Sequence, residues 1–397
     1  MQRGKKSIVL GTTVDQSLVL MAGFPEYLVS RGWDVHIVSS GGPRLTDLSL
    51  SRGVTVHAVT MARDPAVASD IRSLLLWIGL FRKIRPDVAF VGTPKAGLLS
   101  GIAGRITRVP SRVYLLRGLR LETSTGLRRA VYATFERLAM ACASDVIAVS
   151  SSLRARSLDL RLAQPSKISV VGRGSSNGID TANYDSSRFS SSDKQNLREE
   201  LGIVEDVPVV GFVGRLTRDK GVFVFAEALR EMVERDVVLQ VLVVGEVDHE
   251  SGSTALSALR ALDIPVAVAG YVKNPAAHYA LMNVLCLPSY REGFVNVVAE
   301  ASSSGVAVAV SDATGVVDTV VHEVTGLISP VGDALKLADN LCALISDSAK
   351  RDTMGAAGRA WVEANFARHD VQQLHGDALD RLVQASSARR TNETRRS

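Results

Sequence analysis

Short apolar runs alternate with longer amphipathic segments along most of the chain. The apolar runs are rich in Val, Ile and Leu and lack the alternation of a half-exposed strand, so they predict buried strands. The strands predicted in the first half are 7–10, 33–39, 54–59, 87–91, 112–116, 145–149 and 168–171, with helices over 17–30, 71–84, 96–105 and 126–141. Buried strands separated by helices predict a parallel sheet that is covered on both faces.

The pattern breaks in the middle of the chain and then resumes. Residues 173–180 are rich in turn formers, and 186–193 are almost all small and polar. A second series of strands is predicted at 207–213, 238–244, 266–269, 284–287, 306–310 and 326–328, and a helical pattern covers 356–383. We therefore expect an α/β protein of two Rossmann-like, doubly wound domains that face each other across a cleft.

The domain boundaries follow from the same pattern. The amino-terminal domain is expected over 1–185 and the carboxy-terminal domain over 196–365, with a hinge near 174–195. A helix at about 366–385 could cross back onto the first domain, and 386–397 is expected to be a disordered tail. In such sheets ligands bind at the carboxyl ends of the strands, so the loops there should carry the chemistry.

Composition excludes several classes of protein. Of 397 residues, 46% are hydrophobic and 22% charged, which excludes a disordered or fibrous chain. The net charge of +5 conceals an asymmetry: 25 Lys and Arg against 13 Asp and Glu over 1–185, but 17 against 27 over 186–385. A basic half of this kind is typical of a surface that meets phosphate or anionic lipid. We expect no nucleic-acid partner, because no aromatic and basic binding pattern accompanies the charge.

The cysteines and the apolar segments bear on the compartment. Cys142, Cys286 and Cys342 are isolated and lack C-x-x-C spacing, which fits a reducing compartment and argues against a zinc site. The chain has no signal-peptide pattern at its start and no run of about 18 uncharged apolar residues. We expect a cytoplasmic protein, peripheral on the inner face of the plasma membrane.

The most informative loop follows the strand predicted at 207–213. Its sequence is G-F-V-G-R-L-T-R-D-K-G over 211–221, which places Arg215 and Lys220 between a strand and a helix. Two cations and backbone N–H groups in such a loop suit a diphosphate. The alternative is an ordinary solvated loop with two surface cations, and the loop taken alone does not decide between them.

A second loop follows the strand predicted at 284–287. Glu292 lies at the start of a helix expected near Val295, and Glu300 lies inside that helix. The amides there would point at an anion, while carboxylates accept hydrogen bonds from sugar hydroxyls. The alternative makes Glu292 a helix cap and Glu300 an exposed residue, but the V-V-A-E-A context of Glu300 requires a partner for its carboxylate.

Together the two loops resemble those of the retaining, GT-B-fold glycosyltransferases of family 4. The resemblance implies that Arg215 and Lys220 bind a nucleotide diphosphate, that Glu300 binds the ribose, and that Glu292 contacts the donor sugar. It also implies that 270–272 hold the base, which we expect to be uracil, through the backbone. The implied donor-binding residues are Gly214, Arg215, Lys220, Tyr271, Val272, Glu292, Gly293, Phe294, Val295, Asn296 and Glu300.

The amino-terminal half is similar to family members that build bacterial lipid-linked oligosaccharides for capsule, O-antigen or N-glycans. The similarity lies in 92–97, 117–122 and 174–180, and it implies an acceptor sugar on undecaprenyl diphosphate. The candidate acceptor-binding residues are Thr12, Thr13, Ser17, Lys95 and Arg117.

The chain departs from the family at two places. It has Gly11-Thr-Thr where many relatives have Gly-Gly, and no His between His57 and His249, where many relatives have one that touches the donor sugar. Glu122 and Arg117, after the strand predicted at 112–116, are the nearest polar candidates to replace that His, although Glu122 could equally be a carboxylate at the start of a helix.

The resemblance implies transfer of a hexose or N-acetylhexosamine from a UDP-sugar with retention at the anomeric carbon. The catalytic candidates are Glu292, Arg215, Lys220 and Glu122. We expect no cofactor and no metal, since the chain has no D-x-D motif and its seven His residues make no ligand cluster. The leaving diphosphate would then be stabilised by the cations and by amides at a helix end.

Residues 71–85 are apolar on almost every side, with cations at their end. They fit an interfacial helix on anionic lipid, but a helix buried under the sheet would look the same. The cations within or near this segment are Arg82, Lys83, Arg85, Lys95, Arg105 and Arg108.

Other functions fit the sequence less well. A nicotinamide-dependent enzyme would need G-x-G-x-x-G after the first strand, and this chain has G-T-T-V-D-Q. A glycosyltransferase with a soluble acceptor and a GT-B sugar-nucleotide epimerase remain alternatives. A sugar-binding protein without activity would be expected to lose the Arg, Lys and Glu set that is present here.

Overall fold

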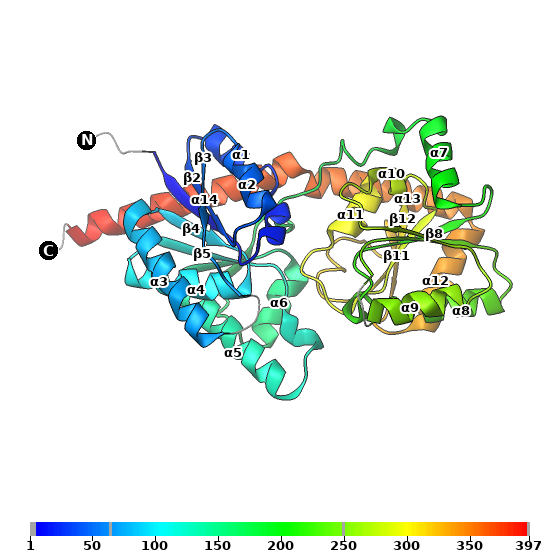
Figure 1. The fold of residues 1–397 in the computed structure, drawn as a ribbon, viewed down its shortest axis with the longest axis horizontal. Coiled ribbons are helices and arrows are strands. Elements are labelled where there is room, and N and C mark those ends of the chain that lie inside the picture. Colours follow the sequence, from blue (N-terminus) through cyan, green and yellow to red (C-terminus); the bar gives the residue numbers. More distant parts are fainter. Residues whose placement is uncertain (1–4, 63–65, 248–250, 395–397) are drawn as a thin grey trace. The chain divides into compact units, whose positions relative to one another are not determined.

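The computed structural model describes residues 5–62, 66–247 and 251–394 in two compact units (Figure 1). The first unit comprises residues 1–178 and 369–397, and the second comprises 179–368. The chain thus passes from the first unit to the second after Gly178 and returns after Arg368. The first crossing falls within the turn-rich stretch where the hinge was expected.

The first unit is built on a seven-stranded parallel sheet with the order β3-β2-β1-β4-β5-β6-β7. Its strands are β1 (Ser7–Gly11), β2 (Asp34–Ser39), β3 (Val54–Ala58), β4 (Val88–Val91), β5 (Ser111–Leu116), β6 (Asp145–Ala148) and β7 (Ile168–Val170). Helices lie on both sides of this sheet (Figure 1). The chain order reverses direction between β1 and β4, which makes the carboxyl ends of these two strands the expected ligand site.

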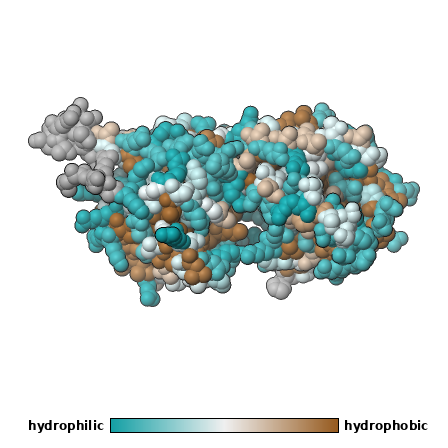
Figure 2. Space-filling view, turned by 90° about the horizontal axis from the view of Figure 1, so that it is seen from above, coloured by the Kyte–Doolittle hydropathy of each residue, from teal (hydrophilic) through white to brown (hydrophobic). Residues whose placement is uncertain are grey.

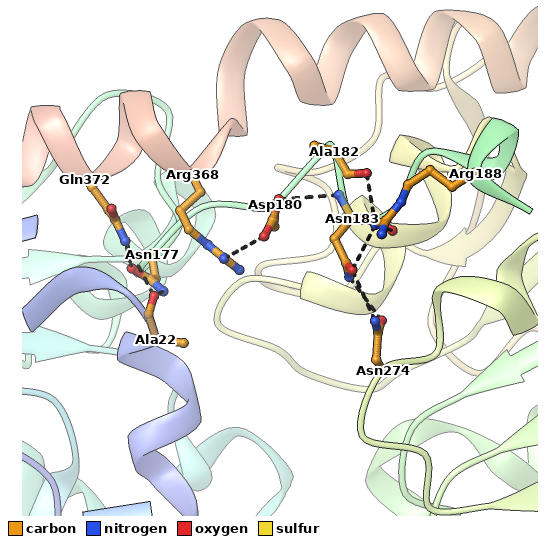
Figure 3. A network of polar contacts seen from close by, with 9 residues as sticks. All are labelled: Ala22, Asn177, Asp180, Ala182, Asn183, Arg188, Asn274, Arg368 and Gln372. Carbon is orange, nitrogen blue, oxygen red and sulfur yellow. Dashed lines mark hydrogen bonds and ion pairs between the residues drawn. The ribbon is translucent and has the colours of Figure 1, made fainter. Parts of the chain in front are cut away.

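The helices of the first unit come from both ends of the chain. They are η1 (Asp15–Met21), α1 (Phe24–Ser30), α2 (Pro43–Ser49), α3 (Val67–Ile84), α4 (Pro94–Ile106), η2 (Arg120–Thr123), α5 (Gly126–Cys142), α6 (Ser151–Asp159) and most of α14 (Arg368–Thr394). Helix α14 is held here by Gln372, which donates to Asn177 at 2.9 Å, and Asn177 in turn donates to the Ala22 carbonyl at 2.7 Å (Figure 3).

The second unit contains a six-stranded parallel sheet with the order β10-β9-β8-β11-β12-β13. Its strands are β8 (Val209–Val213), β9 (Gln240–Val244), β10 (Val266–Gly270), β11 (Val284–Leu287), β12 (Ala307–Ser311) and β13 (Gly326–Ser329). The order again reverses beside the first strand, between β8 and β11. This reversal places the two loops singled out by the sequence next to each other at one edge of the sheet.

Helices cover both faces of the second sheet. They are η3 (Ser186–Arg188), α7 (Ser191–Leu201), η4 (Arg218–Lys220), α8 (Val222–Glu234), α9 (Ser251–Arg260), α10 (Ala276–Tyr279), α11 (Asn296–Ser303), α12 (Ala334–Ser346) and α13 (Ser348–Phe366). Figure 1 shows α8, α9 and α12 on one face and α10, α11 and α13 on the other. Every residue of β8, β9, β11 and β12 is buried, as expected of central strands in a parallel sheet. The predicted α/β fold with two Rossmann-like units is confirmed.

Three predicted elements differ from the structure. The helix expected over 17–30 is divided into η1 and α1, because Gly23 adopts a left-handed conformation (φ 78°). The pattern over 356–383 belongs to two helices, which meet at Ala367, where the backbone is extended (ψ 134°). The expected disordered tail is helical as far as Thr394, where α14 ends. Residues 395–397 of that tail lie outside the described part.

Candidate active site

The donor-site candidates of the second unit lie at the switch point of its sheet. Strands β8 and β11 are neighbours, with Val210 opposite Val284 and Gly211 opposite Leu285. The loops that leave their carboxyl ends cover 214–221 and 288–295, and they contain both sequence motifs. The parallel pairing of β8 with β11 thus brings together two loops that are about 70 residues apart in the sequence.

Glycine permits the close contact of these two loops. Gly221 has φ 75°, and a Cβ atom there would lie 1.9 Å from the carbonyl oxygen of Pro288. In a third loop, which follows β12, Gly315 has φ 79°, and a Cβ atom there would lie 2.5 Å from the carbonyl oxygen of Gly293. Both positions therefore combine a left-handed backbone with a space that admits no side chain.

Lys220 and Glu292 form an ion pair across the two loops. The Lys220 ammonium donates to Oε1 of Glu292, and the Ser289 hydroxyl donates to the same oxygen at 2.9 Å. The two side chains are 23% and 14% exposed, so the pair is shielded yet open to a ligand. Arg215, at the end of β8, is exposed to solvent. The structure thus gathers a cation, a carboxylate and a hydroxyl at one point.

Asp219 is a member of this site that the sequence did not single out. Its carboxylate accepts a hydrogen bond from the Thr217 hydroxyl at 2.6 Å and forms an ion pair with Arg291 at 3.1 Å. Burial would raise its pKa, but the Thr217 hydrogen bond and the charges of Arg291, Lys220 and Arg215 outweigh burial and lower it. Asp219 therefore ties the two loops together as an anion, since Arg291 belongs to the second of them.

Glu300 lies inside α11 and has aromatic partners. Tyr279 donates its hydroxyl to Oε2 of Glu300 at 2.9 Å, and Tyr184 hydrogen-bonds to the same carboxylate. Burial raises the pKa of Glu300 against the opposing effect of these hydrogen bonds. The partner that its apolar sequence context required is thus present, and the alternative of an exposed helix face is wrong. Its partners come from 21 and more residues away and could not be read from the motif.

The start of α11 supplies backbone donors close to Glu292. The helix begins at Asn296, with Val295 as its N-cap residue and no side-chain hydrogen bond to the cap. The first N–H groups of a helix have no partner within the helix and attract anions. Phe294 packs against Phe366 with ring centroids 4.9 Å apart, which fixes the course of this loop. The candidates Gly293 to Asn296 are therefore together at one helix end.

The candidate base-binding loop follows β10. The carbonyl of Gly270 accepts a hydrogen bond from the Gly245 amide at 2.7 Å, which joins it to the loop after β9. Tyr271 is 60% exposed, whereas Val272 packs partly against the core of the unit. Strand β10 is separated from β8 by β9, so this loop lies along the same edge of the sheet as the cationic loop.

The acceptor candidates of the first unit divide into two groups. Thr13, Ser17 and Lys95 line one cavity of about 450 Å³. Thr12 is fully buried, and its hydroxyl donates to the Ser39 hydroxyl at 3.2 Å. Arg117 donates to the carbonyl of Gly92 at 3.2 Å instead of lining the cavity, and burial lowers its pKa to about 10. Three of the five candidates are thus brought together, and two are not.

Thr13 and Lys95 hold the loops around this cavity in place. The Thr13 hydroxyl hydrogen-bonds to that of Thr93 at 2.8 Å and accepts from the Ala96 amide at 3.2 Å, at the start of α4. The Lys95 ammonium pairs with Asp70 on α3 at 2.8 Å. These contacts join the carboxyl ends of β1 and β4, which is the switch point of the first sheet.

Glu122, one candidate to replace the missing His, is held by a cation. It lies in η2 with its side chain 9% exposed and pairs with Arg156 at 3.3 Å. A His does join this unit from a distant part of the sequence, because His375 of α14 hydrogen-bonds to the Ser175 carbonyl at 3.1 Å. Burial lowers the pKa of His375 to about 4, so its ring is neutral at physiological pH. The sequence allowed this helix to return to the first domain but did not single out His375.

The part of the chain that the structure describes contains no cluster of three His, Cys, Asp or Glu side chains arranged to hold a metal ion. In the same described residues, no helix is both long and apolar enough to cross a bilayer.

Two family models match the two units. Glycosyl transferase 4-like domain matches 22–174, and Glycosyl transferases group 1 matches 193–361. A capsular polysaccharide biosynthesis glycosyltransferase of Staphylococcus aureus, CapM, is 39% identical over 89% of this chain and 92% of its own length. An Escherichia coli UDP-Gal:alpha-D-GlcNAc-diphosphoundecaprenol alpha-1,3-galactosyltransferase is 24% identical over 81% of this chain and 82% of its own.

Solved structures share the fold at low sequence identity. Sucrose-phosphate synthase of Thermosynechococcus elongatus has a TM-score of 0.79 at 21% identity and covers 96% of this chain and all of its own. Anabaena HepE in complex with UDP-glucose has a TM-score of 0.76 at 19% identity, over 94% of this chain and 99% of its own. These neighbours and the two sheets show the GT-B fold, and the two family models with the S. aureus relative show a glycosyltransferase. The chain belongs to glycosyltransferase family 4.

Proposed function

We propose that the protein transfers a hexose or N-acetylhexosamine from a UDP-sugar to a saccharide on a polyprenyl diphosphate, with retention at the anomeric carbon. The observation that carries the proposal is the Lys220–Glu292 pair between two loops at the switch point of the second sheet. A diphosphate needs cations, and sugar hydroxyls need carboxylates. Both groups occur here within hydrogen-bonding distance of each other.

Donor binding would rearrange this pair. The diphosphate oxygens take the Lys220 ammonium, assisted by Arg215 and by the amides at the start of α11. The Glu292 carboxylate, released from Lys220, then accepts hydrogen bonds from the donor sugar, while Glu300 accepts them from the ribose. The backbone at 270–272 holds the base. The Lys220–Glu292 pair keeps both charges compensated until the donor arrives.

The chemical step breaks the bond between the anomeric carbon and the β-phosphate oxygen. An acceptor hydroxyl oxygen forms the new bond on the same face of the sugar, and its proton passes to the leaving phosphate oxygen. Arg215 and Lys220 stabilise the charge that develops on the diphosphate, and a single donor of this kind contributes about 3 kcal/mol in other enzymes. Because these cations supply the positive charge, we expect transfer to proceed without a divalent metal.

The acceptor class is supported by the first unit and by two relatives. Helix α3 has one buried face, with Trp77 and Phe81, and one exposed apolar face, with Ile71 and Leu75. One face of this helix is thus buried, and the exposed apolar face supports the interfacial interpretation of residues 71–85. The printed names of the S. aureus and E. coli relatives concern capsular polysaccharide and a diphosphoundecaprenol sugar. We therefore propose a role in bacterial surface polysaccharide synthesis, with the protein peripheral on the inner face of the plasma membrane.

A donor screen tests the proposal. UDP release is measured for a panel of UDP-sugars, with and without a sugar-bearing polyprenyl diphosphate, for the wild type and for Lys220→Ala and Glu292→Gln. We expect acceptor-dependent release with one donor, reduced more than about tenfold in either variant. Arg218→Gln is the matched control, since Arg218 is an exposed cation of the same loop that lies over the Phe223 ring. Near-normal turnover in either site variant would sink the assignment, and release with soluble saccharides alone would overturn the lipid-linked acceptor.

A further inference from the structure

The cavity of the first unit has walls that the donor chemistry does not explain. It lies among α3, α4 and α5 and the loops that follow β1 and β4. Most of its lining is hydrocarbon or aromatic ring. The lining residues are Thr13, Val14, Ser17, Ala66, Asp70, Ile71, Leu74, Thr93, Pro94, Lys95, Leu98, Leu99, Arg120, Tyr132, Phe135 and Glu136. A sugar would leave most of its hydroxyls unpaired against such walls.

The cavity has few charged groups, and most of these are compensated. Lys95 pairs with Asp70, and Glu136 accepts a hydrogen bond from the Tyr114 hydroxyl at 3.0 Å. Arg120 lies over the Tyr132 ring, 5.2 Å from its centroid, a contact that leaves its positive charge in place. The formal charges of the lining thus balance, and Arg120, the exposed one of its two cations, is the group that the anionic end of an apolar ligand could meet.

Two of the helices that border the cavity, α3 and α5, also expose apolar side chains to solvent. Ile71 lines the cavity and is 56% exposed, and Leu75, one turn further along α3, is 63% exposed. On α5, Leu127 is 81% exposed and Val131 is also exposed. Figure 2 shows hydrophobic residues interrupting the hydrophilic surface of the first unit, on the left of that view. An apolar ligand could thus reach the cavity from a lipid surface along α3.

We propose that this cavity binds the isoprenoid units next to the diphosphate of the lipid-linked acceptor, with Arg120 pairing with that diphosphate. The inference rests on the proposed function and extends it by assigning the lipid, and not the acceptor sugar, to this cavity. Its volume of about 450 Å³ equals that of about 15 water molecules in the liquid. A carbon of a hydrocarbon chain occupies about the space of one water, so the cavity has room for about three isoprene units.

Binding of farnesyl diphosphate and of inorganic diphosphate to the full-length protein, measured by titration calorimetry with saturating UDP to occupy the donor site, tests the proposal. Farnesyl diphosphate carries three isoprene units on the same anionic group. We expect farnesyl diphosphate to bind at least about tenfold more tightly than inorganic diphosphate, because its isoprenoid chain passes from water into the apolar cavity. A wild-type protein that binds the two ligands equally would overturn the proposal.

Variants that fill the cavity test the contribution of the isoprenoid chain to binding separately from that of the diphosphate. Leu98→Trp and Leu74→Trp should each lower the affinity for farnesyl diphosphate by about tenfold and leave inorganic diphosphate unaffected. Leu127→Trp, on exposed α5 surface outside the lining, is the matched control and should change neither. Unchanged farnesyl diphosphate binding in both filling variants, with the melting temperature of the wild type, would refute the assignment.

Arg120→Gln should lower the affinity for both farnesyl diphosphate and inorganic diphosphate, whereas Arg128→Gln should change neither affinity. Arg128 approaches the same Tyr132 ring at 5.9 Å but does not line the cavity, which makes it the charge-matched control. Equal losses in the two variants would indicate general electrostatic attraction and contradict the role of Arg120.

The outcome also distinguishes this inference from the proposed function. Farnesyl diphosphate binding that depends on Leu98, without transfer to any lipid-linked acceptor, would support the cavity assignment and refute the function. Transfer to a lipid-linked acceptor that is indifferent to Leu98→Trp and Leu74→Trp would support the function and refute the cavity assignment.

Discussion

Glu136 in the first unit is buried, and its ionisation should make this unit less stable at alkaline pH. Its side chain is buried on α5, and burial raises its pKa from the ordinary 4.5 to about 7, in spite of the Tyr114 hydrogen bond. We predict that Glu136→Gln stabilises the first unit at pH 8. Glutamine keeps an oxygen that accepts from Tyr114 and carries no charge to be buried.

The sign and size follow from proton linkage. Between pH 4.5 and about 7 the folded unit holds a proton that the unfolded chain has released, so its stability falls as the pH rises. Each unit of pKa difference corresponds to about 1.4 kcal/mol. The loss therefore reaches about 3 kcal/mol near pH 7 and remains constant above it. The gain from Glu136→Gln should thus be about 3 kcal/mol at pH 8 and below about 1 kcal/mol at pH 5.

The assay is urea unfolding followed by tryptophan fluorescence at the two pH values. Trp33 and Trp77 are buried in the first unit, and a Trp361→Phe background removes the only other tryptophan, so the signal reports this unit. The lowered pKa of His375 makes stability rise with pH, but it does so equally with and without Glu136→Gln. Its effect therefore cancels when the two proteins are compared. An equal fall in stability from pH 5 to pH 8 with and without Glu136→Gln would refute the reasoning.

Two further predictions concern the donor loop and the membrane. Gly221→Ala should lower the free energy of unfolding by about 1–3 kcal/mol and weaken UDP binding, because the new methyl group meets a carbonyl oxygen at a left-handed backbone position. The control is Gly202→Ala, where the backbone is also left-handed (φ 66°) but the space is open, and it should cost only about 1 kcal/mol. Equal costs for the two variants would contradict the close approach of the loops. Binding to anionic vesicles should fall with salt and weaken at least about tenfold when Arg82, Lys83 and Arg85 become Gln. Absent or salt-independent binding would remove the membrane claim.

The sequence predicted the fold well because its main signals are local. Unbroken aliphatic runs mark strands that are buried on both faces, and the structure has a strand at each predicted position. The family resemblance implied that Lys220 and Glu292 serve one donor site, whereas their ion pair was not predicted. The helix boundary at Gly23 was missed because the apolar periodicity continues through it, while the backbone there does not.

What the sequence could not predict depends on contacts between distant residues. Tyr184 and Tyr279 reach Glu300 only when three separate segments pack together. A return of the last helix to the first unit is compatible with the sequence, but the contact of His375 with Ser175 depends on how that helix packs there. The cavity likewise depends on the packing of three helices, whose side chains carry no motif. Such features are set by tertiary structure, and no local pattern encodes them.

The central claim is that the Lys220 loop of the second unit binds the diphosphate of a nucleotide sugar. Its most direct test is the dissociation constant of UDP, measured by titration calorimetry for Lys220→Met and for Arg218→Gln. Methionine keeps the apolar stem of Lys220 and removes its charge-assisted hydrogen bond, which contributes about 1.5–3 kcal/mol. We predict that UDP binds Lys220→Met at least about tenfold more weakly than the wild type, and Arg218→Gln as tightly as the wild type. Equal affinity of Lys220→Met and the wild type for UDP would contradict the account.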